Sequence, residues 1–390
     1  MALAVFGAFG CGDDGAARDG GGGGGDGGPG GSDAGPSSLP VDCVDRATTD
    51  RRCEFPMNLS PGEVGGGPSL RSIYRGSFGN PEISGGFADA AGNRLVAAVT
   101  LGSDTSNDYG AIVTIDLDSG DRTVVSGEFE DSRSGLTMVG AGQSFGEAFD
   151  VRAGVDGWYV WGSLALVRVD PATGDRTDLW DAPANPCPCR NVNGISMAAG
   201  AAGEAYLSMY NPGNGIAEIA DGSCGAATLV GHSDPSMDVG GGLVVTSTLW
   251  EALQRDGDRL YASLGGFLVY VDLVTGDRIG VSSPDRALGV GDADLGRYGL
   301  AVDGDRVWTA GSSTSRSVEG YRQFATVVAA DVETGDREVF YGALNTPLVT
   351  GGDSDERVWV HPDGETLIMS MDGAVFRYDP ATGNAFVLSY

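Results

Sequence analysis

One stretch of about 14 residues recurs along most of this chain and limits the folds open to it. The stretch reads VRVDPATGDRTDLW at 167–180, and its close relatives are VTIDLDSGDRTVV (113–125), VYVDLVTGDRIGV (269–281), VAADVETGDREVF (328–340) and VFRYDPATGNAFVL (375–388). A more divergent copy, AEIADGSCGAATLV, occupies 217–230. The shared aspartates recur every 48 to 59 residues, which indicates a repeat architecture; they are Asp116, Asp170, Asp221, Asp272, Asp331 and Asp379.

Each copy predicts two short strands around a tight turn. Apolar and polar residues alternate before the turn, which is typical of a half-buried strand. The turn glycine is expected to adopt a positive φ, and the aspartate before it to accept from backbone N–H groups; these glycines are Gly120, Gly174, Gly276, Gly335 and Gly383. An arginine follows the turn in four copies, and we interpret it as an exposed charge on an edge strand that discourages edge-to-edge pairing. These arginines are Arg122, Arg176, Arg278 and Arg337.

Two more strands precede each hairpin. In the fourth unit they are predicted at 243–250 and 259–264, while 298–311 and 357–370 carry both strands of the fifth and sixth units. Four antiparallel strands in each unit of roughly 50 residues predict an all-β fold, a six-bladed β-propeller over 78–390. A seven-bladed ring, with a blade formed partly by 69–77, remains the alternative.

Composition narrows the functional classes. The net charge is −30, and all 24 basic residues are arginine. The absence of lysine excludes lysine Schiff-base chemistry by this chain. An acidic chain also lacks the basic face that phosphate contacts need, so we expect no nucleic-acid partner. No run of residues approaches the roughly 20 apolar positions of a transmembrane helix.

The N-terminal part predicts export and tethering. Residues 1–10 are a short apolar, signal-like segment, and Ala8–Cys11 resembles a bacterial lipobox with an imperfect Phe9. The resemblance implies cleavage before Cys11 and its lipidation, and Gly12 after it favours the outer membrane over retention in the inner one. A soluble secreted protein is the alternative. Residues 11–42 are rich in Gly and Asp, cannot bury enough apolar surface to fold, and are expected to form a disordered linker.

The remaining cysteines suit an exported protein. In the segment 43–77 we expect a disulfide between Cys43 and Cys53. The pairing of Cys187, Cys189 and Cys224 stays open. Cys187 and Cys189 lie between the second and third blades, whereas Cys224 lies in a hairpin turn. We expect these two kinds of loop to open on opposite faces of the ring. A disulfide between them would then need an unusual path.

Ligand sites in propellers lie where the loops that lead into the innermost strands converge on the channel. Those loops each carry a carboxylate or carboxamide, and such oxygens suit a divalent cation such as Ca²⁺; the residues are Glu82, Glu147, Asn193, Asp238, Asp292, Asp294 and Asp355. Polar loop residues are equally expected from a chain with 54 acidic residues. His361, one of two histidines, is interpreted as a solvated turn residue, and Trp308 and Trp359 as core.

Several strands resemble known propeller families. YGLAVDGDRVWTA (298–310) and NGISMAAGAAGEAYLS (193–208) are similar to the blade pattern of NHL-repeat and SMP-30/gluconolactonase-like proteins. The lactonases of that kind hold a divalent metal on a Glu, an Asn and an Asp, and Glu82 and Asn193 match the first two. Tyr298 stands where the Asp is expected, so Asp238 or Asp294 would have to substitute.

These observations favour a non-catalytic binding or interaction module, displayed at the cell envelope by a lipid anchor and facing the periplasm or the exterior. Its expected partner is a protein, peptide or glycan at the channel face, and it contacts the membrane only through the anchor. A metal-dependent hydrolase or lactonase, with the metal on Glu82, Asn193 and an Asp, is the alternative. Fold alone does not decide between them, and the oligomeric state stays open.

Overall fold

A computed structural model gives the arrangement of the chain. It describes residues 39–40, 42–44, 52–54, 65–67, 82–101, 109–131, 135–163, 165–181, 196–209, 215–228, 241–242, 252–264, 267–283, 288–290, 299–317, 320–340, 348–349, 357–371, 374–381 and 384–389. The chain divides into two units, Met1–Gly35 and Pro36–Tyr390, and every described residue belongs to the second. Within these ranges no helix is long and apolar enough to cross a membrane.

Six antiparallel sheets follow one another along the chain, in the order that the repeat predicts. The first contains β4 (Glu82–Asp89), β5 (Arg94–Leu101), β6 (Tyr109–Asp116), β7 (Arg122–Asp131) and β8 (Gly135–Val139). The second contains β9 (Ala148–Gly154), β10 (Gly157–Gly162), β11 (Ala165–Val169) and β12 (Arg176–Asp181). The third contains β13 (Met197–Ala199), β14 (Ala205–Met209), β15 (Gly215–Ala220) and β16 (Ser223–Thr228).

The other three sheets repeat the pattern. The fourth contains β17 (Ala252–Asp256), β18 (Arg259–Leu264), β19 (Phe267–Asp272) and β20 (Arg278–Ser282). The fifth contains β21 (Gly299–Asp303), β22 (Arg306–Ser317), β23 (Gly320–Asp331) and β24 (Arg337–Phe340). The sixth contains β26 (Arg357–Val360), β27 (Leu367–Met371), β28 (Ala374–Asp379) and β29 (Asn384–Ser389).

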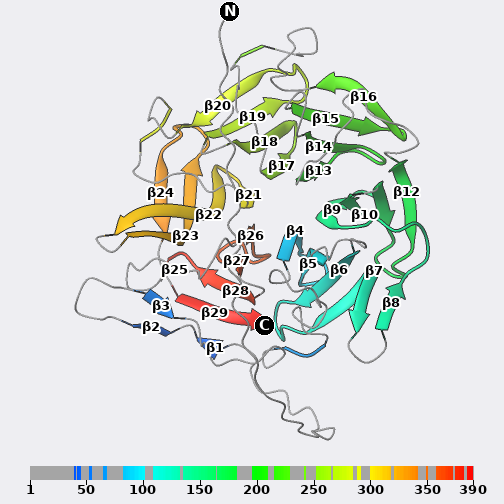
Figure 1. Cartoon of the computed structure of the whole chain (residues 1–390). Coiled ribbons are helices and arrows are strands. Elements are labelled where there is room, and N and C mark those ends of the chain that lie inside the picture. The colour runs from blue at the N-terminus through cyan, green and yellow to red at the C-terminus, as the bar shows by residue number, and fades with distance from the viewer. Residues whose placement is uncertain are drawn as a thin grey trace, which may run out of the picture. The chain divides into compact units, whose positions relative to one another are not determined.

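These sheets are the blades of a closed ring, and the six-bladed prediction is confirmed. The first strand of each sheet lies innermost, and in Figure 1 β4, β9, β13, β17, β21 and β26 surround the centre. Each innermost strand contacts that of the next blade, and β26 contacts β4, which closes the ring. One strand was predicted in the wrong place: the innermost strand of the fourth blade is Ala252–Asp256, and not 243–250, because only the later segment forms the hairpin with β18.

N-terminal strands extend two of the blades. β1 (Leu39–Pro40) pairs with β29 as a fifth strand of the sixth blade. β2 (Asp42–Val44) and β3 (Arg52–Glu54) form a hairpin that joins the fifth blade through β25 (Leu348–Val349). Within that hairpin Cys43 and Cys53 are direct partners across the ladder. Their disulfide stays a prediction, although directly opposed antiparallel residues are close enough for one.

The hydrophobic core lies between neighbouring blades, because no blade covers its own two faces. Val96 and Ala98 of the first blade pack with Val160 and Val167 of the second. Across the closure, Leu95 and Val113 of the first blade pack with residues of the sixth, Trp359 and Ile368 among them. Trp308 and Trp359 are buried, as expected.

The turn chemistry of the repeat is confirmed. The glycines at 120, 174, 276 and 335 have φ between 74° and 78°. Asp170 Oδ1 accepts from the backbone N–H groups of Ala172 and Thr173, at 2.8 and 3.4 Å. Asp331 Oδ1 accepts in the same way from Glu333 and Thr334. Gly383 lies outside the described residues.

The arginine after the turn, however, is not an exposed edge charge. Arg122, Arg176, Arg278 and Arg337 expose only 3, 6, 3 and 8% of their surface. Arg122, Arg176 and Arg337 follow turns that lie against the preceding blade: a Cβ on Gly174, for example, would lie 1.9 Å from the carbonyl oxygen of Val125. The prediction was wrong because the arginine at the start of the outermost strand is buried against residues outside its own blade, which the pattern of a single blade does not reveal.

Three of these arginines, Arg122, Arg176 and Arg337, fasten one blade to the next. Arg176 Nη1 donates to Ser126 Oγ of the first blade at 3.1 Å, and that hydroxyl donates to the Gly174 carbonyl at 2.7 Å. The same pair of bonds, at the same distances, joins Arg337 to Ser282 and Ser282 to Gly335. Arg122 Nη1 donates to Ser389, which links the first blade to the last. We call each such set an arginine latch.

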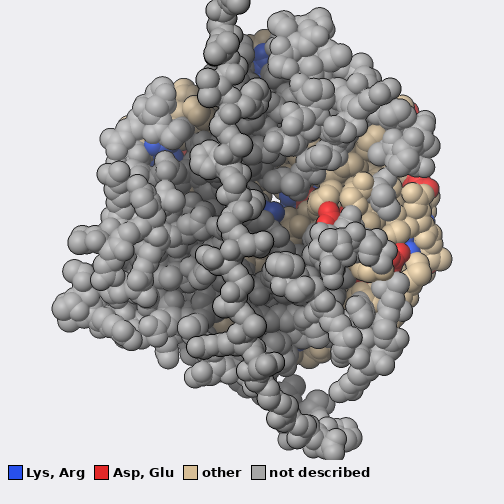
Figure 2. All heavy atoms as spheres, in the orientation of Figure 1, with Lys and Arg blue, Asp and Glu red and all other residues tan. Residues whose placement is uncertain are grey.

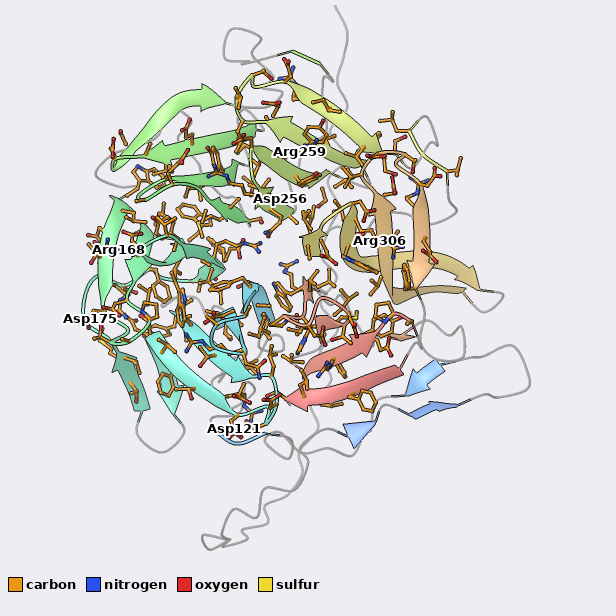
Figure 3. The ribbon with its side chains drawn as sticks, turned by 180° about the vertical axis from the view of Figure 1, so that it is seen from behind. Asp121, Arg168, Asp175, Asp256, Arg259 and Arg306 are labelled. Atoms are coloured by element: carbon orange, nitrogen blue, oxygen red, sulfur yellow. The ribbon has the colours of Figure 1, made fainter. Side chains whose placement is uncertain are left out.

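A glycine-containing segment completes each latch. The backbone N–H of Arg176 donates to the Ala141 carbonyl, and Asp175 Oδ1 accepts from the Ala141 N–H at 2.7 Å. Equivalent pairs join Asp121 and Arg122 to Gly66, Asp277 and Arg278 to Gly241, and Asp336 and Arg337 to Val290. Asp121 and Asp175 lie at the outer rim of the ring in Figure 3. The segments that connect the blades therefore do reach the hairpin turns, contrary to the expectation that these loops open on opposite faces.

Candidate functional site

The predicted channel residues fall mostly outside the described residues. Asn193, Asp238, Asp292, Asp294, Asp355 and Tyr298 are not described, nor are Cys11, Cys187 and Cys189. Glu82 is the first residue of the innermost strand β4. Glu147 directly precedes β9 and is half-buried, and its backbone N–H donates to Ser163 Oγ at 3.1 Å. These two therefore stand where the chain leads into an innermost strand, as expected; we call this end of the ring the loop face.

Polar side chains that the sequence analysis did not single out meet on the innermost strands. The central one is Asp150, the third residue of β9, with 1% of its surface exposed. Its Oδ1 accepts from the N–H of Val151 at 2.8 Å, and its Oδ2 from the N–H of Met197 at 2.9 Å. Burial raises the pKa of the Asp150 carboxyl, while Arg152, the Met197 N–H and Arg357 oppose that rise.

Arg152 is the counter-charge, and it spans several blades. Its Nη2 lies 3.0 Å from Asp150 Oδ2, and its Nε donates to the Met197 carbonyl of the third blade at 3.0 Å. Its Nη1 donates to the Gly86 carbonyl of the first blade at 2.8 Å and to Gln254 Oε1 of the fourth at 3.2 Å. One guanidinium thus contacts four blades, and such charge-assisted bonds are the strong ones.

The other innermost strands join the same network. Ser196, just before β13, donates to Asp150 Oδ2 at 3.3 Å and accepts from the Leu253 N–H at 2.9 Å. Arg357 Nε of the sixth blade donates to the Ser84 carbonyl of the first at 2.9 Å. Trp359 Nε1 donates to the Gly86 carbonyl at 2.7 Å. We call this set the axial hub; it consists of Ser84, Asp150, Arg152, Ser196, Gln254 and Arg357.

Glycine lets the innermost strands approach each other around the hub. A Cβ on Gly85 would lie 2.2 Å from Asp150 Oδ1, and one on Gly299 would lie 2.7 Å from the Val358 N–H nitrogen. The cavity left between these strands has a volume of about 10 Å³, enough for about one water molecule. In Figure 2, which views the ring from the same side as Figure 1, basic and acidic side chains lie near each other at the centre of the ring.

The hub is suited to holding the ring together. Its carboxylate is surrounded by two backbone N–H groups, a hydroxyl and a guanidinium, which is the pairing that a buried charge needs. Among the described residues no group of three or more His, Cys, Asp and Glu side chains is arranged to hold a metal ion. A sequence signal did exist: Asp150 and Arg152 are two residues apart on an innermost strand, so both side chains point to the same face.

His361 is in a turn, as predicted, but it is buried and not solvated. Its Nδ1 accepts from the Asp363 N–H at 3.2 Å, and burial lowers the pKa of the imidazole. Asp363 in turn lies 2.5 Å from Arg377 Nη2 and accepts from the N–H groups of Glu365 and Thr366. His361 is therefore a packed part of the turn between β26 and β27.

The similarity of this chain to known proteins is found among solved structures. No protein-family model matches the chain, and no curated protein is similar in sequence. Among solved structures, the WD40 domain of Neurospora crassa Pan2 is 12% identical with a TM-score of 0.43, over 78% of this chain and 77% of that one. The calcium-binding protein regucalcin from Agrobacterium tumefaciens is 13% identical with a TM-score of 0.45, over 79% and 90%. The tricorn protease is 12% identical with a TM-score of 0.41, over 79% and 26%.

Proposed function

We propose that this chain is a non-catalytic binding module that the cell displays at its envelope on a lipid-anchored, flexible tether. The arrangement of the axial hub carries the proposal. Asp150 is the one fully buried carboxylate with a raised pKa among the described groups, and such a residue is the usual candidate for a catalytic acid or base. Its oxygens are already occupied by neighbours from its own and the adjacent blade, which favours a structural role.

A propeller with a structural hub recognises partners through its surface loops, because loops carry binding residues on a rigid scaffold. The net charge of −30 favours a protein partner with a basic segment, since complementary charge speeds encounter and selects partners. The anchor and tether rest on Cys11 and the Gly-rich segment 11–42.

Site-specific photocrosslinking in the native envelope tests this proposal. Ser163 is exposed on the loop face beside Glu147. We expect a photoreactive residue at this position to capture one discrete protein, and the captured amount to fall when the salt concentration is raised. The matched control is Ala172, exposed in a hairpin turn, which should capture none. A Cys11→Ser chain should appear in the soluble fraction. Equal capture from both positions, or none from Ser163, would contradict a loop-face binding module.

The metal-dependent lactonase remains the alternative, because Glu82 begins an innermost strand. We expect chelator-treated protein to unfold at the same temperature with and without added Ca²⁺, since only an ion that binds the folded state raises the unfolding temperature. Glu82→Gln should leave that result unchanged. If 1 mM Ca²⁺ stabilises the protein by several degrees and Glu82→Gln abolishes the effect, the metal enzyme becomes the better proposal.

A further inference from the structure

A groove opens between the fourth and fifth blades, at the end of the ring opposite the loop face. Its volume is about 640 Å³, within the range of about 300–1,000 Å³ that small-molecule sites occupy. Arg259 pairs with Asp256 at the far end of the innermost strand β17, and Figure 3, which views the ring from behind, shows both residues on the fourth blade. The lining includes Arg259, Tyr270, Ile279, Leu288, Val332 and Glu333.

One wall of the groove is a cation stacked on an aromatic ring. The Arg259 guanidinium lies 4.9 Å from the centre of the Tyr270 ring, and its Nη1 donates to Tyr261 Oη at 3.4 Å. The centres of the Tyr261 and Tyr270 rings are 5.7 Å apart. Two aromatic residues therefore hold the exposed guanidinium, and its planar set of N–H donors, at the edge of the groove.

The opposite wall is the turn between β23 and β24 of the fifth blade, and the arginine latch fixes this turn to the fourth blade. Ser282 Oγ donates to the Gly335 carbonyl at 2.7 Å, and Asp336 Oδ1 accepts from the Val290 N–H at 2.9 Å. The exposed side chain of Glu333 therefore stands on a backbone that is bonded to both blades. A site that is already ordered loses less entropy when a ligand binds.

Aliphatic side chains form much of the remaining lining. Ile279 exposes 37% of its surface, and Leu288 and Val332 are half-buried. Ile279 also pairs with Tyr270 across the ladder between β19 and β20, so the ring and the aliphatic side chain are neighbours. The groove thus presents an apolar strip with a guanidinium on one side and a carboxylate on the other.

The position of Tyr270 is used differently in other blades. It lies two residues before the shared aspartate of the repeat, and the second and sixth blades carry Arg168 and Arg377 there. Each of these arginines is paired with an aspartate of its own blade, at 2.6 and 2.5 Å. The fourth blade has a ring and an apolar strip in place of such an ion pair, so the repeat itself does not require this surface.

The charges of the groove favour a neutral ligand. Arg259 repels a cation, whereas Glu333 and the net charge of −30 repel an anion. A sugar ring has apolar C–H faces and hydroxyl groups that both donate and accept, which matches an apolar strip between a guanidinium and a carboxylate. We propose that this groove binds a neutral oligosaccharide, with hydroxyl groups on Arg259 and Glu333 and C–H faces on Tyr270 and Ile279. The groove is separate from the loop face, so this site does not depend on the function proposed above.

Binding of the full chain to a glycan array tests the proposal. The array carries neutral oligosaccharides of glucose, galactose, mannose and N-acetylglucosamine beside oligosaccharides that contain uronic acids or sulfate groups. We expect the protein to bind at least one neutral oligosaccharide and to prefer it to the acidic ones. A protein that binds no neutral oligosaccharide, or that prefers the acidic ones, would overturn the proposal.

Substitutions in the groove show whether the oligosaccharide is held there. Arg259→Gln and Glu333→Gln should each weaken its binding about tenfold or more, and Ile279→Thr about fourfold, in calorimetric titrations. All three side chains are exposed, so the unfolding temperature should stay close to that of the parent. Arg306→Gln is the matched control, because this exposed arginine also lies over an aromatic ring, at 5.9 Å. Val274→Thr, exposed in the turn between β19 and β20, is the control for Ile279→Thr. If a control weakens binding as much as its partner in the groove, the sugar binds elsewhere and the proposal is wrong.

A basic peptide is the competing occupant, because the chain is acidic and Glu333 lines the groove. Fluorescent nona-arginine, followed by anisotropy, should not displace the bound oligosaccharide, and Glu333→Gln should not change its binding. If nona-arginine displaces the oligosaccharide and Glu333→Gln weakens the binding of nona-arginine, the groove is a docking site for a basic peptide and the assignment to a sugar is overturned.

Discussion

Replacement of Arg176 by alanine is expected to destabilise the protein by about 3 kcal/mol, because it removes a buried charge and leaves its acceptors without a donor. Its guanidinium donates to Ser126 Oγ, to the Gln143 carbonyl at 2.8 Å and to the Val139 carbonyl at 2.8 Å. Burial lowers the pKa of Arg176, which indicates that the guanidinium has lost much of its hydration. Denaturant unfolding followed by tryptophan fluorescence measures the loss.

The matched control is Arg168→Ala. Arg168 pairs with Asp156 at 2.6 Å, but the two side chains expose 37% and 35% of their surface, and exposed pairs contribute less than about 1 kcal/mol. Figure 3 shows Arg168 at the outer part of the second blade. A double-mutant cycle adds a sharper test: Arg176→Ala should couple with Ser126→Ala and be additive with Ser282→Ala, which belongs to another latch. If Arg176→Ala costs no more than Arg168→Ala, the latches do not stabilise the ring.

The repeat motif allowed most of the fold to be predicted, because its features are local. The aspartate and the glycine of the turn act within one hairpin, so their roles follow from a few residues of sequence. The role of the arginine does not follow, because its partners belong to the preceding blade and to the connecting segment. The sequence carries a Gly-x-Gly segment ahead of four of the Gly-Asp-Arg turns, at 65–67, 140–142, 240–242 and 289–291. The meaning of these segments emerges only when each is matched to the Gly-Asp-Arg turn of the blade that follows it.

The candidate site was harder to predict, for a related reason. Glu82 and Glu147 were chosen because they come just before or at the start of an innermost strand, and they do stand at the loop face. The axial hub lies within the strands, where alternating polarity usually means a solvated face. In a closed ring the innermost strands face one another, so Asp150 and Arg152 are buried by distant segments. His361, which its turn sequence marked as exposed, is buried as well.

Replacement of Arg152 by methionine is expected to destabilise the protein more than a change of similar size at any exposed ion pair among the described residues. It leaves the carboxylate of Asp150 buried without its adjacent counter-charge, and breaking a buried pair in this way costs about 3–5 kcal/mol. The Gly86 and Met197 carbonyls and Gln254 also lose their donor. Arg168→Met, at an exposed ion pair, is the matched control and should cost less than about 1 kcal/mol.

The pH dependence of the stability of Arg152→Met shows whether the loss of stability comes from the unpaired charge of Asp150. Burial already raises the pKa of Asp150 in the folded protein, and loss of Arg152 raises it further. A carboxyl whose folded-state pKa exceeds its unfolded value favours the folded state when it is protonated and loses that contribution as the pH rises through the folded pKa. The deficit of Arg152→Met relative to the parent should therefore shrink as the pH falls from 7 towards 4. Adding Asp150→Asn should restore part of the stability at pH 7 and flatten this dependence. A deficit that is the same at every pH, and that Asp150→Asn deepens, would mean that Arg152 acts by packing alone and that the hub does not depend on its charges.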